Sequence, residues 1–158
     1  MYRIGTVLVA ILLTGCGFQM RGVATVPPEM SRTYIETNDR YSLFYRELRD
    51  SFRRSGIEVV DAPIDATATF TIHADQTGQR VLSVSARNVP REFEVFYVVS
   101  YDVVASDKVI LEPRTQTLTR DYTWDETEVL GKEKEEQLLR TSVVNDLIRV
   151  ILIQLSSL

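Results

Sequence analysis

The chain of 158 residues is poor in the residue types that build disulfide frameworks and metal sites. It contains one cysteine and one histidine, which excludes an intrachain disulfide and a cysteine-rich zinc site. Positive charge is also in deficit, since 18 lysines and arginines stand against 22 aspartates and glutamates, a formal net charge of −4. A general nucleic-acid binder carries a basic excess, so nucleic acid is disfavoured as a partner.

Long hydrophobic runs are absent, and the most apolar segment is a short one at the N-terminus. The run from Ile4 to Leu13 carries no charge, but its length of about ten residues is half of the roughly 20 that a transmembrane helix needs. It ends in the sequence Leu-Thr-Gly-Cys at residues 13–16, which is similar to the lipobox of bacterial lipoproteins. We therefore expect residues 1–15 to be a lipoprotein signal peptide that is cleaved before Cys16.

The single cysteine then becomes the attachment point of the protein to a membrane. A diacylglyceryl group on the sulfur of Cys16 and an acyl chain on its amine give at least the two chains that stable anchoring requires. Gly17 follows the cysteine, whereas lipoproteins kept in the inner membrane typically carry aspartate there, so delivery to the outer membrane is favoured. The alternative is that Cys16 is an ordinary apolar residue of an uncleaved N-terminal helix.

The rest of the chain predicts a lipidated tether over residues 16–30 and one α+β domain over residues 31–158. Apolar spacing predicts one helix of about four turns, which starts at Asn38 and Asp39 and is closed by Gly56, and another from Lys132 to Leu155. Residues 57–60 are expected to lead back toward the sheet. Strands are expected over residues 32–37, 66–85 with a break near Gly78, 92–104, and 109–124 with Pro113 at a bulge or edge. Alternation in the second of these strands predicts one buried face, formed by Ala66, Ala68, Phe70, Ile72 and Ala74. The order β-α-β-β-β-α predicts a sandwich: a mixed four-stranded sheet with two helices packed on one face.

The last predicted helix is apolar on nearly every side. Its apolar residues include Leu139, Val143, Leu147, Ile148, Val150, Ile151, Leu152, Ile153 and Leu155. One sheet face cannot bury such a helix all round, so the pattern predicts a partner surface. The alternative is a terminal helix packed entirely in the core of its own domain.

Residues that could carry catalysis are scarce. His73 falls with Thr67, Thr69 and Thr71 on the polar face of the strand predicted from residue 66, which is typical of a surface position. No Gly-rich phosphate loop, nucleophile elbow or paired metal motif accompanies the carboxylates. We expect no enzymatic activity, no metal site, and no cofactor other than the covalent lipid on Cys16.

Basic residues gather in two predicted loops. Arg87 and Arg91 follow the second strand, and Lys132 and Lys134 lie just before or at the start of the last helix. Hairpin strands alternate in direction and a right-handed crossover makes the first two strands parallel, so both loops lie at the end opposite the start of the first strand. Such a cluster suits a phosphorylated or otherwise anionic ligand. The alternative is solvated loop charge that neighbouring glutamates offset.

The sequence CGFQMRG at residues 16–22, with Val26-Pro27 shortly after, resembles the start of the LptE family of lipopolysaccharide-assembly lipoproteins. Length, element order and loop placement are similar over most of the chain. The resemblance implies an outer-membrane lipoprotein that plugs the LptD β-barrel from the periplasmic side, assists its assembly and binds lipopolysaccharide during insertion into the outer leaflet. It further implies that Arg87 and Lys132 contact this ligand.

A second class of function stays open on the residues alone. An auxiliary lipoprotein of an ABC-type lipid transporter would bind phospholipid in a cavity of its own, and would need no barrel. A surface hydrolase fits the residue inventory poorly.

Overall fold

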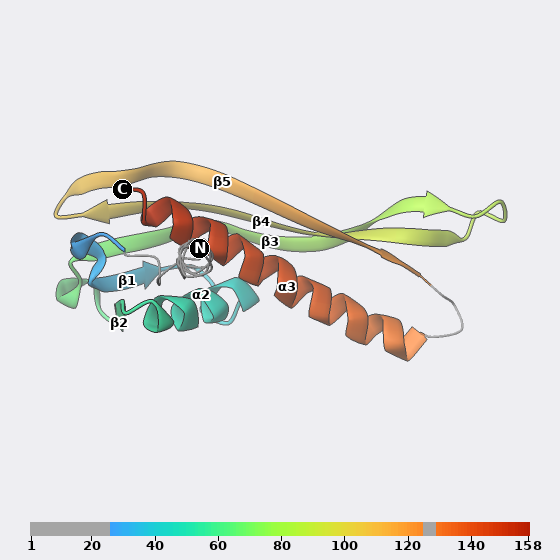
Figure 1. Cartoon of the computed structure of the whole chain (residues 1–158), viewed down its shortest axis with the longest axis horizontal. Helices are drawn as coiled ribbons and strands as arrows, with labels where there is room; N and C mark the ends of the chain where they lie inside the picture. The colour runs from blue at the N-terminus through green and yellow to red at the C-terminus, as the bar shows by residue number, and fades with distance from the viewer. Residues whose placement is uncertain (1–25, 125–128) are drawn as a thin grey trace, which may run out of the picture.

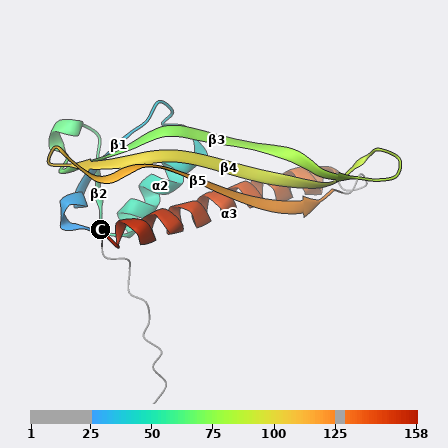
Figure 2. The ribbon, with the colours of Figure 1, turned by 90° about the horizontal axis from the view of Figure 1, so that it is seen from above.

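The structure is a computed structural model that describes residues 26–124 and 129–158. Its elements are η2 (Pro28–Met30), β1 (Arg32–Glu36), α2 (Leu43–Arg54), β2 (Glu58–Val60), η3 (Pro63–Asp65), β3 (Ala68–Val84), β4 (Pro90–Ala105), β5 (Lys108–Thr123) and α3 (Val129–Leu155). The strands form one sheet in the order β2-β1-β3-β4-β5. Helices α2 and α3 lie on the same face of this sheet (Figures 1 and 2). The predicted α+β sandwich with a mixed sheet is confirmed.

The sheet has five strands where four are predicted. The additional strand, β2, spans three residues and pairs in parallel with β1, from Arg32↔Glu58 to Tyr34↔Val60. The sequence does predict that residues 57–60 return toward the sheet, but three residues are too few to show an alternation pattern. The parallel pairing of β1 with β3, expected from the crossover rule, is present.

Strand β3 runs unbroken through Gly78, so the predicted break is wrong. The 17 residues of β3 span up to about 56 Å at about 3.3 Å per residue. A Cβ at residue 78 would lie 2.6 Å from Cζ of Phe96 on the neighbouring strand. Glycine therefore permits the close approach of an aromatic ring within a continuous strand, which is a recognised use of glycine in sheets.

A bulge changes which side chains of β3 face the helices. Phe70 and Ile72 are buried against them, as the predicted alternation requires, but the register with β4 shifts between Ile72 and Ala74. Beyond the shift, Asp75 and Thr77 take the helix-facing positions, and the expectation that Ala74 continues the buried face is wrong. His73, at the bulge, is a surface strand residue as expected, with Nε2 2.8 Å from Oδ1 of Asp102.

Strand β5 contains a second bulge at the predicted place. The pairing moves from Tyr101↔Arg114 to Val103↔Leu111, so Pro113 falls within the irregular segment. Because β5 is at the end of the strand order, a residue without a backbone N–H costs no pairing with a further strand. The prediction that Pro113 marks a bulge or an edge is confirmed on both counts.

Helix α2 begins four residues later than the sequence predicts. Asp39 accepts a hydrogen bond from the Tyr41 backbone N–H at 2.8 Å, which forms a turn in place of a helix cap. Ser42 is the actual cap, and its Oγ accepts from the Tyr45 N–H at 3.0 Å. Gly56, at a φ of 83°, ends the helix as predicted.

The core fills the space between the two helices and the sheet. Phe70 stacks on Tyr101 with ring centroids 5.2 Å apart and meets Phe52 edge-on at 5.5 Å, which ties α2 to β3 and β4. Met30 is fully buried in this core. The last residue of the predicted tether therefore belongs to the packed domain.

Helix α3 buries much of its apolar surface inside the domain. The buried residues are Val143, Val144, Leu147, Ile148, Ile151 and Leu155. Leu138, Val150 and Ile153 stay exposed. The apolar surface that α3 leaves for a partner is therefore smaller than predicted and is confined to part of one side of the helix. Of the helices in residues 26–124 and 129–158, none has the length and hydropathy needed to cross a membrane.

Candidate functional site: the distal tip

The end of the molecule farthest from the start of β1 is formed by the hairpin of β3 and β4, which extends beyond the end of β5 (Figure 1). We call residues 79–93 the distal tip. A compact turn joins the strands, with hydrogen bonds from Ser85 N to Val89 O at 2.7 Å and from Asn88 N to Ser85 O at 2.9 Å. Asn88 adopts a left-handed φ of 59°, which asparagine tolerates well. Arg87 precedes Asn88 on this turn and is exposed to solvent.

Arg91 lies where the hairpin joins the body of the sheet. Its carbonyl accepts a hydrogen bond of 2.7 Å from the Trp124 N–H, at the end of β5. Phe93 stacks on Tyr122 at 5.7 Å and meets Trp124 edge-on at the same centroid distance. The end of β5 therefore lies beside Arg91, at the end of the sheet where the two loops are expected to meet. The first residues of the second loop, 125–128, lie outside the described residues.

The two lysines are placed differently from the arginines. Helix α3 begins at Val129, three residues before the predicted start, so Lys132 and Lys134 belong to its first turns rather than to a loop. Lys134 is exposed, whereas the side chain of Lys132 is outside the described part of the chain. The same end of the molecule carries all four residues, but on two separate elements.

Charge at the tip is only partly compensated. Arg80 pairs with Glu94 at 2.5 Å, and Glu92 accepts a hydrogen bond from the Ser83 hydroxyl at 2.6 Å. Within residues 26–124 and 129–158, no ion pair engages Arg87 or Arg91. Two exposed guanidinium groups are therefore available to an anionic ligand in a protein whose net charge is negative.

The tip also exposes aliphatic side chains that the sequence does not single out. Val81, Leu82 and Val84 each have about half of their surface exposed. Two register shifts between Val81 and Val84 interrupt the pairing with β4, so alternation cannot predict which of these residues face solvent. Together with the arginines they make the tip amphipathic, a surface suited to a ligand with anionic and apolar parts.

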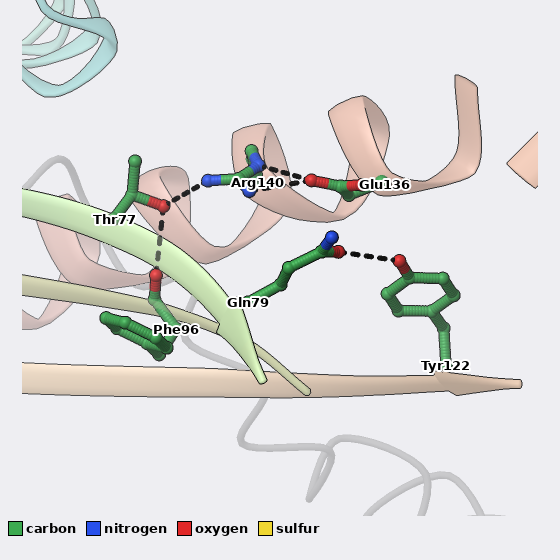
Figure 3. A network of polar contacts seen from close by, with 6 residues as sticks. All are labelled: Thr77, Gln79, Phe96, Tyr122, Glu136 and Arg140. Carbon is green, nitrogen blue, oxygen red and sulfur yellow. Dashed lines mark hydrogen bonds and ion pairs between the residues drawn. The ribbon is translucent and has the colours of Figure 1, made fainter. Parts of the chain in front are cut away.

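A seam of polar contacts holds the first half of α3 against the sheet near the tip (Figure 3). Arg140 donates to the Thr77 hydroxyl at 2.6 Å and to Glu136 at 2.6 and 3.0 Å. Thr77 in turn donates to the carbonyl of Phe96 at 2.9 Å. The hydroxyl of Tyr122 donates to Oε1 of Gln79 at 2.9 Å. The contact between Arg140 and Thr77 fixes the helix that carries the lysines relative to the hairpin that carries the arginines, and the contacts of Thr77 with Phe96 and of Tyr122 with Gln79 join the strands beneath it.

The same seam contains a tyrosine with a perturbed pKa. The Tyr97 hydroxyl donates a hydrogen bond of 2.5 Å to Oδ1 of Asp75. Burial, followed by this hydrogen bond and the negative charge of Asp75, raises the pKa of Tyr97 well above its ordinary value. The group is a neutral donor at physiological pH, so its role is to hold β3 and β4 together.

Within the described ranges, no three His, Cys, Asp or Glu side chains are arranged to hold a metal ion.

Known proteins resemble this chain in sequence and in fold. It matches the LptE family, described as Lipopolysaccharide-assembly, over residues 30–155. It is 31% identical over 134 residues to the LPS-assembly lipoprotein LptE of Yersinia enterocolitica, covering 83% of this chain and 64% of that protein. It is 29% identical over 143 residues to the LptE of Yersinia pseudotuberculosis, covering 88% and 69%. The chain thus spans about two thirds of the length of these curated relatives.

Solved structures show the same architecture. An uncharacterized lipoprotein B of Nitrosomonas europaea, solved by solution NMR, superposes with a TM-score of 0.73 at 26% identity, covering 89% of this chain and 91% of that one. The rare lipoprotein B of Shewanella oneidensis superposes with a TM-score of 0.68 at 25% identity, covering 80% and 94%. Since the family match extends over most of the chain and includes α2, α3 and every strand of the described residues, the chain belongs to the LptE family.

Proposed function

We propose that this chain is a non-enzymatic outer-membrane lipoprotein that binds lipopolysaccharide at its distal tip while lodged in the lumen of an LptD β-barrel. The observation that carries the proposal is the amphipathic tip, where Arg87 and Arg91 form no ion pair with another described residue and lie beside exposed aliphatic residues. Cys16, outside the described residues, would carry the lipid anchor. Membership of the LptE family supports the assignment.

The chemistry of the tip matches the two parts of lipopolysaccharide. Phosphate groups are strong acceptors for the planar, permanently charged guanidinium of Arg87 and Arg91. The side chains of Val81, Leu82 and Val84 offer apolar contact to acyl chains. Lys134, exposed on α3 at the same end, adds positive charge to this region, and Lys132 is proposed to do the same.

The length of the sheet and its polar surface favour a barrel lumen over lipid as the surroundings of the domain. Strand β3 reaches up to about 56 Å, longer than the roughly 30 Å hydrocarbon core of a bilayer. The face of the sheet away from the helices carries polar residues such as Thr71, His73 and Gln76, and the edge of β5 has unpaired backbone groups. Lipid cannot satisfy such groups, whereas a hydrated protein lumen can.

The alternative of an ABC-type phospholipid carrier finds less support. That function needs an enclosed apolar cavity, but a stack of aromatic rings fills the space between α2 and the sheet. A hollow of about 340 Å³ lies instead at the surface between β5 and α3, and its lining includes Arg120, Asp146 and Arg149. Charged walls of this kind suit a protein segment better than an acyl chain.

The experiment that tests ligand binding compares lipopolysaccharide affinity of the wild type with that of Arg87→Glu/Arg91→Glu at low and high salt. We expect the double variant to bind at least about tenfold more weakly at low salt, with the difference shrinking at high salt because ions screen exposed charges. The matched control is Arg46→Glu/Arg53→Glu, which changes the net charge equally at exposed sites of α2. Equal affinity of the wild type and the tip variant at low salt would refute recognition by the tip.

A second comparison separates the phosphate contribution from that of the acyl chains. Dephosphorylated lipopolysaccharide should bind the wild type about as weakly as intact lipopolysaccharide binds the tip variant, since both lack the same charge-assisted contacts. Val81→Ser/Val84→Ser should lower the affinity for intact and for dephosphorylated lipopolysaccharide by the same factor.

A further inference from the structure

The outer edge of β5 is a long strand edge. Among residues 26–124 and 129–158, β5 pairs only with β4, and its register is regular from Arg114↔Tyr101 to Thr123↔Glu92. Proteins usually blunt such edges with charged side chains, above all lysine, with proline or with a bulge. In β5 the lysine, the proline and the bulge are confined to the first part of the strand, at Lys108 and Pro113, whereas Arg114, Arg120 and Asp121 leave the later pairing regular. Residues 114–123 therefore present backbone donors and acceptors to whatever lies beside them.

A surface groove follows this edge. It has a volume of about 340 Å³ and is lined by Leu118, Thr119, Arg120, Val143, Asp146, Arg149, Val150 and Ile153. Val150 and Ile153 are 36% and 48% exposed and are the apolar residues that α3 does not bury in its own domain near this strand. We call this hollow the β5–α3 groove. Its apolar wall and the free strand edge together provide side-chain and backbone contacts for an extended chain.

The groove also has an unbalanced charge. Asp146 accepts from Arg120 at 2.7 Å through one oxygen and from Arg149 at 2.8 Å through the other. One carboxylate thus serves two guanidinium groups, whose side chains are 54% and 70% exposed. Each guanidinium has five N–H donors, so most of them remain available. An occupant with a carboxylate between the two arginines would complete the pairing.

We propose that an extended segment of a partner protein adds as a further strand to the β5 edge over residues 114–123 and places an aspartate or glutamate between Arg120 and Arg149. Alternate side chains of this segment fill the apolar part of the β5–α3 groove. In strand addition, backbone hydrogen bonds provide affinity and such side-chain contacts provide specificity. The inference rests on the proposed function, since the partner is the barrel protein in whose lumen the chain is lodged.

The test uses the full acylated chain co-expressed with the barrel protein. A photo-reactive amino acid at Ile153 should crosslink to one extended, acidic segment of the barrel protein, identified by mass spectrometry. Amide exchange over residues 114–123 should be at least about tenfold slower in the complex than in the lipoprotein alone, because strand addition occupies the outward N–H groups. The comparison position for crosslinking is Gln76, exposed on the sheet face away from the helices, which should crosslink to a different part of the barrel protein from the segment that Ile153 captures.

Two variants test the charge and the apolar wall separately. Arg120→Glu/Arg149→Glu should reduce recovered complex about tenfold relative to Arg46→Glu/Arg53→Glu, since it replaces attraction with repulsion. Val150→Ser/Ile153→Ser changes only exposed positions, so it keeps the test informative if the charge variant fails to fold.

The possible outcomes separate this inference from the function on which it rests. Recovery of the barrel with unchanged exchange in β5, or a crosslink from Ile153 to a second copy of this chain or only to lipid, would overturn strand addition and leave the barrel partnership standing. Failure to recover any barrel protein with the wild type would overturn both.

Discussion

The aromatic ring of Phe96 lies over Gly78 of the neighbouring strand so closely that a Cβ at residue 78 would be 2.6 Å from the ring. We expect Gly78→Ala to lower the free energy of unfolding by about 1 kcal/mol, because the ring must move away from its contact. In a Phe96→Ala background the same substitution should be neutral or slightly stabilising, since alanine restricts the unfolded chain more than glycine does. Urea unfolding of the four proteins in this cycle measures the coupling.

Additive effects of the two substitutions would contradict this account of Gly78. Thr71→Ala, on the same sheet face but away from the ring, provides a control combination with Phe96→Ala for which no coupling is expected.

Arg140 is the residue of α3 that joins this helix to β3, through the Thr77 hydroxyl at 2.6 Å. Arg140→Ala should lower the free energy of unfolding by about 1 to 3 kcal/mol, the range for a hydrogen bond to a charged group. Amide exchange should accelerate most in residues 133–140 and least near Ile151, which apolar packing holds in place. Arg46→Ala is the control. Uniform acceleration along the whole helix would argue against a local tether.

Stability at alkaline pH depends on Tyr97, whose pKa is raised above 10.0 by burial and by Asp75. In the unfolded chain the pKa returns to about 10, so the stabilising contribution is complete below that pH and is lost as pH rises through the folded-state pKa. The free energy of unfolding should therefore fall above about pH 10. Burial also raises the pKa of Tyr101 and Tyr122, so Tyr97→Phe should make this decline shallower without abolishing it. Identical slopes in both proteins would show that Tyr97 does not contribute.

We expect Cys16 to carry the lipid anchor. Cys16→Ser should abolish acylation, because serine lacks the thiol that forms the thioether, and should leave the N-terminal segment uncleaved. Intact-mass measurement of protein from the membrane fraction should show the mass of acyl chains on the wild type only. Unacylated wild-type protein with an intact N-terminal segment would instead support the alternative of an ordinary helix.

Periodicity and chain order predict much of the fold. Phe44, Leu48 and Phe52 form the buried face of α2 as their spacing indicates, and the parallel pairing of β1 with β3 follows the crossover rule. Features set by pairing between distant strands escape this reasoning. The shift between Ile72 and Ala74 depends on β4 and has no local signature, so the helix-facing positions of the later β3 residues could not be predicted.

The candidate site is predictable to a similar degree. Chain order brings the β3–β4 hairpin, which carries Arg87 and Arg91, to the end opposite the start of β1, and Figure 1 shows this hairpin there. The polar seam is not predictable, because it needs the bulge to turn Thr77 toward Arg140. The early start of α3 at Val129 also escapes prediction, since it places Gly131 inside the helix, where glycine is intrinsically unfavourable. Exposed Val81 and Leu82 lie among register shifts, which a two-residue repeat cannot describe.

The most direct measurement is the composition and native mass of the complex recovered with the tagged, acylated chain from gently solubilised outer membranes. The account predicts one copy of this chain bound to one LptD barrel, with lipopolysaccharide retained by the wild type and depleted in Arg87→Glu/Arg91→Glu. Recovery of the lipoprotein as a monomer, or in a complex that contains no outer-membrane barrel, would contradict it.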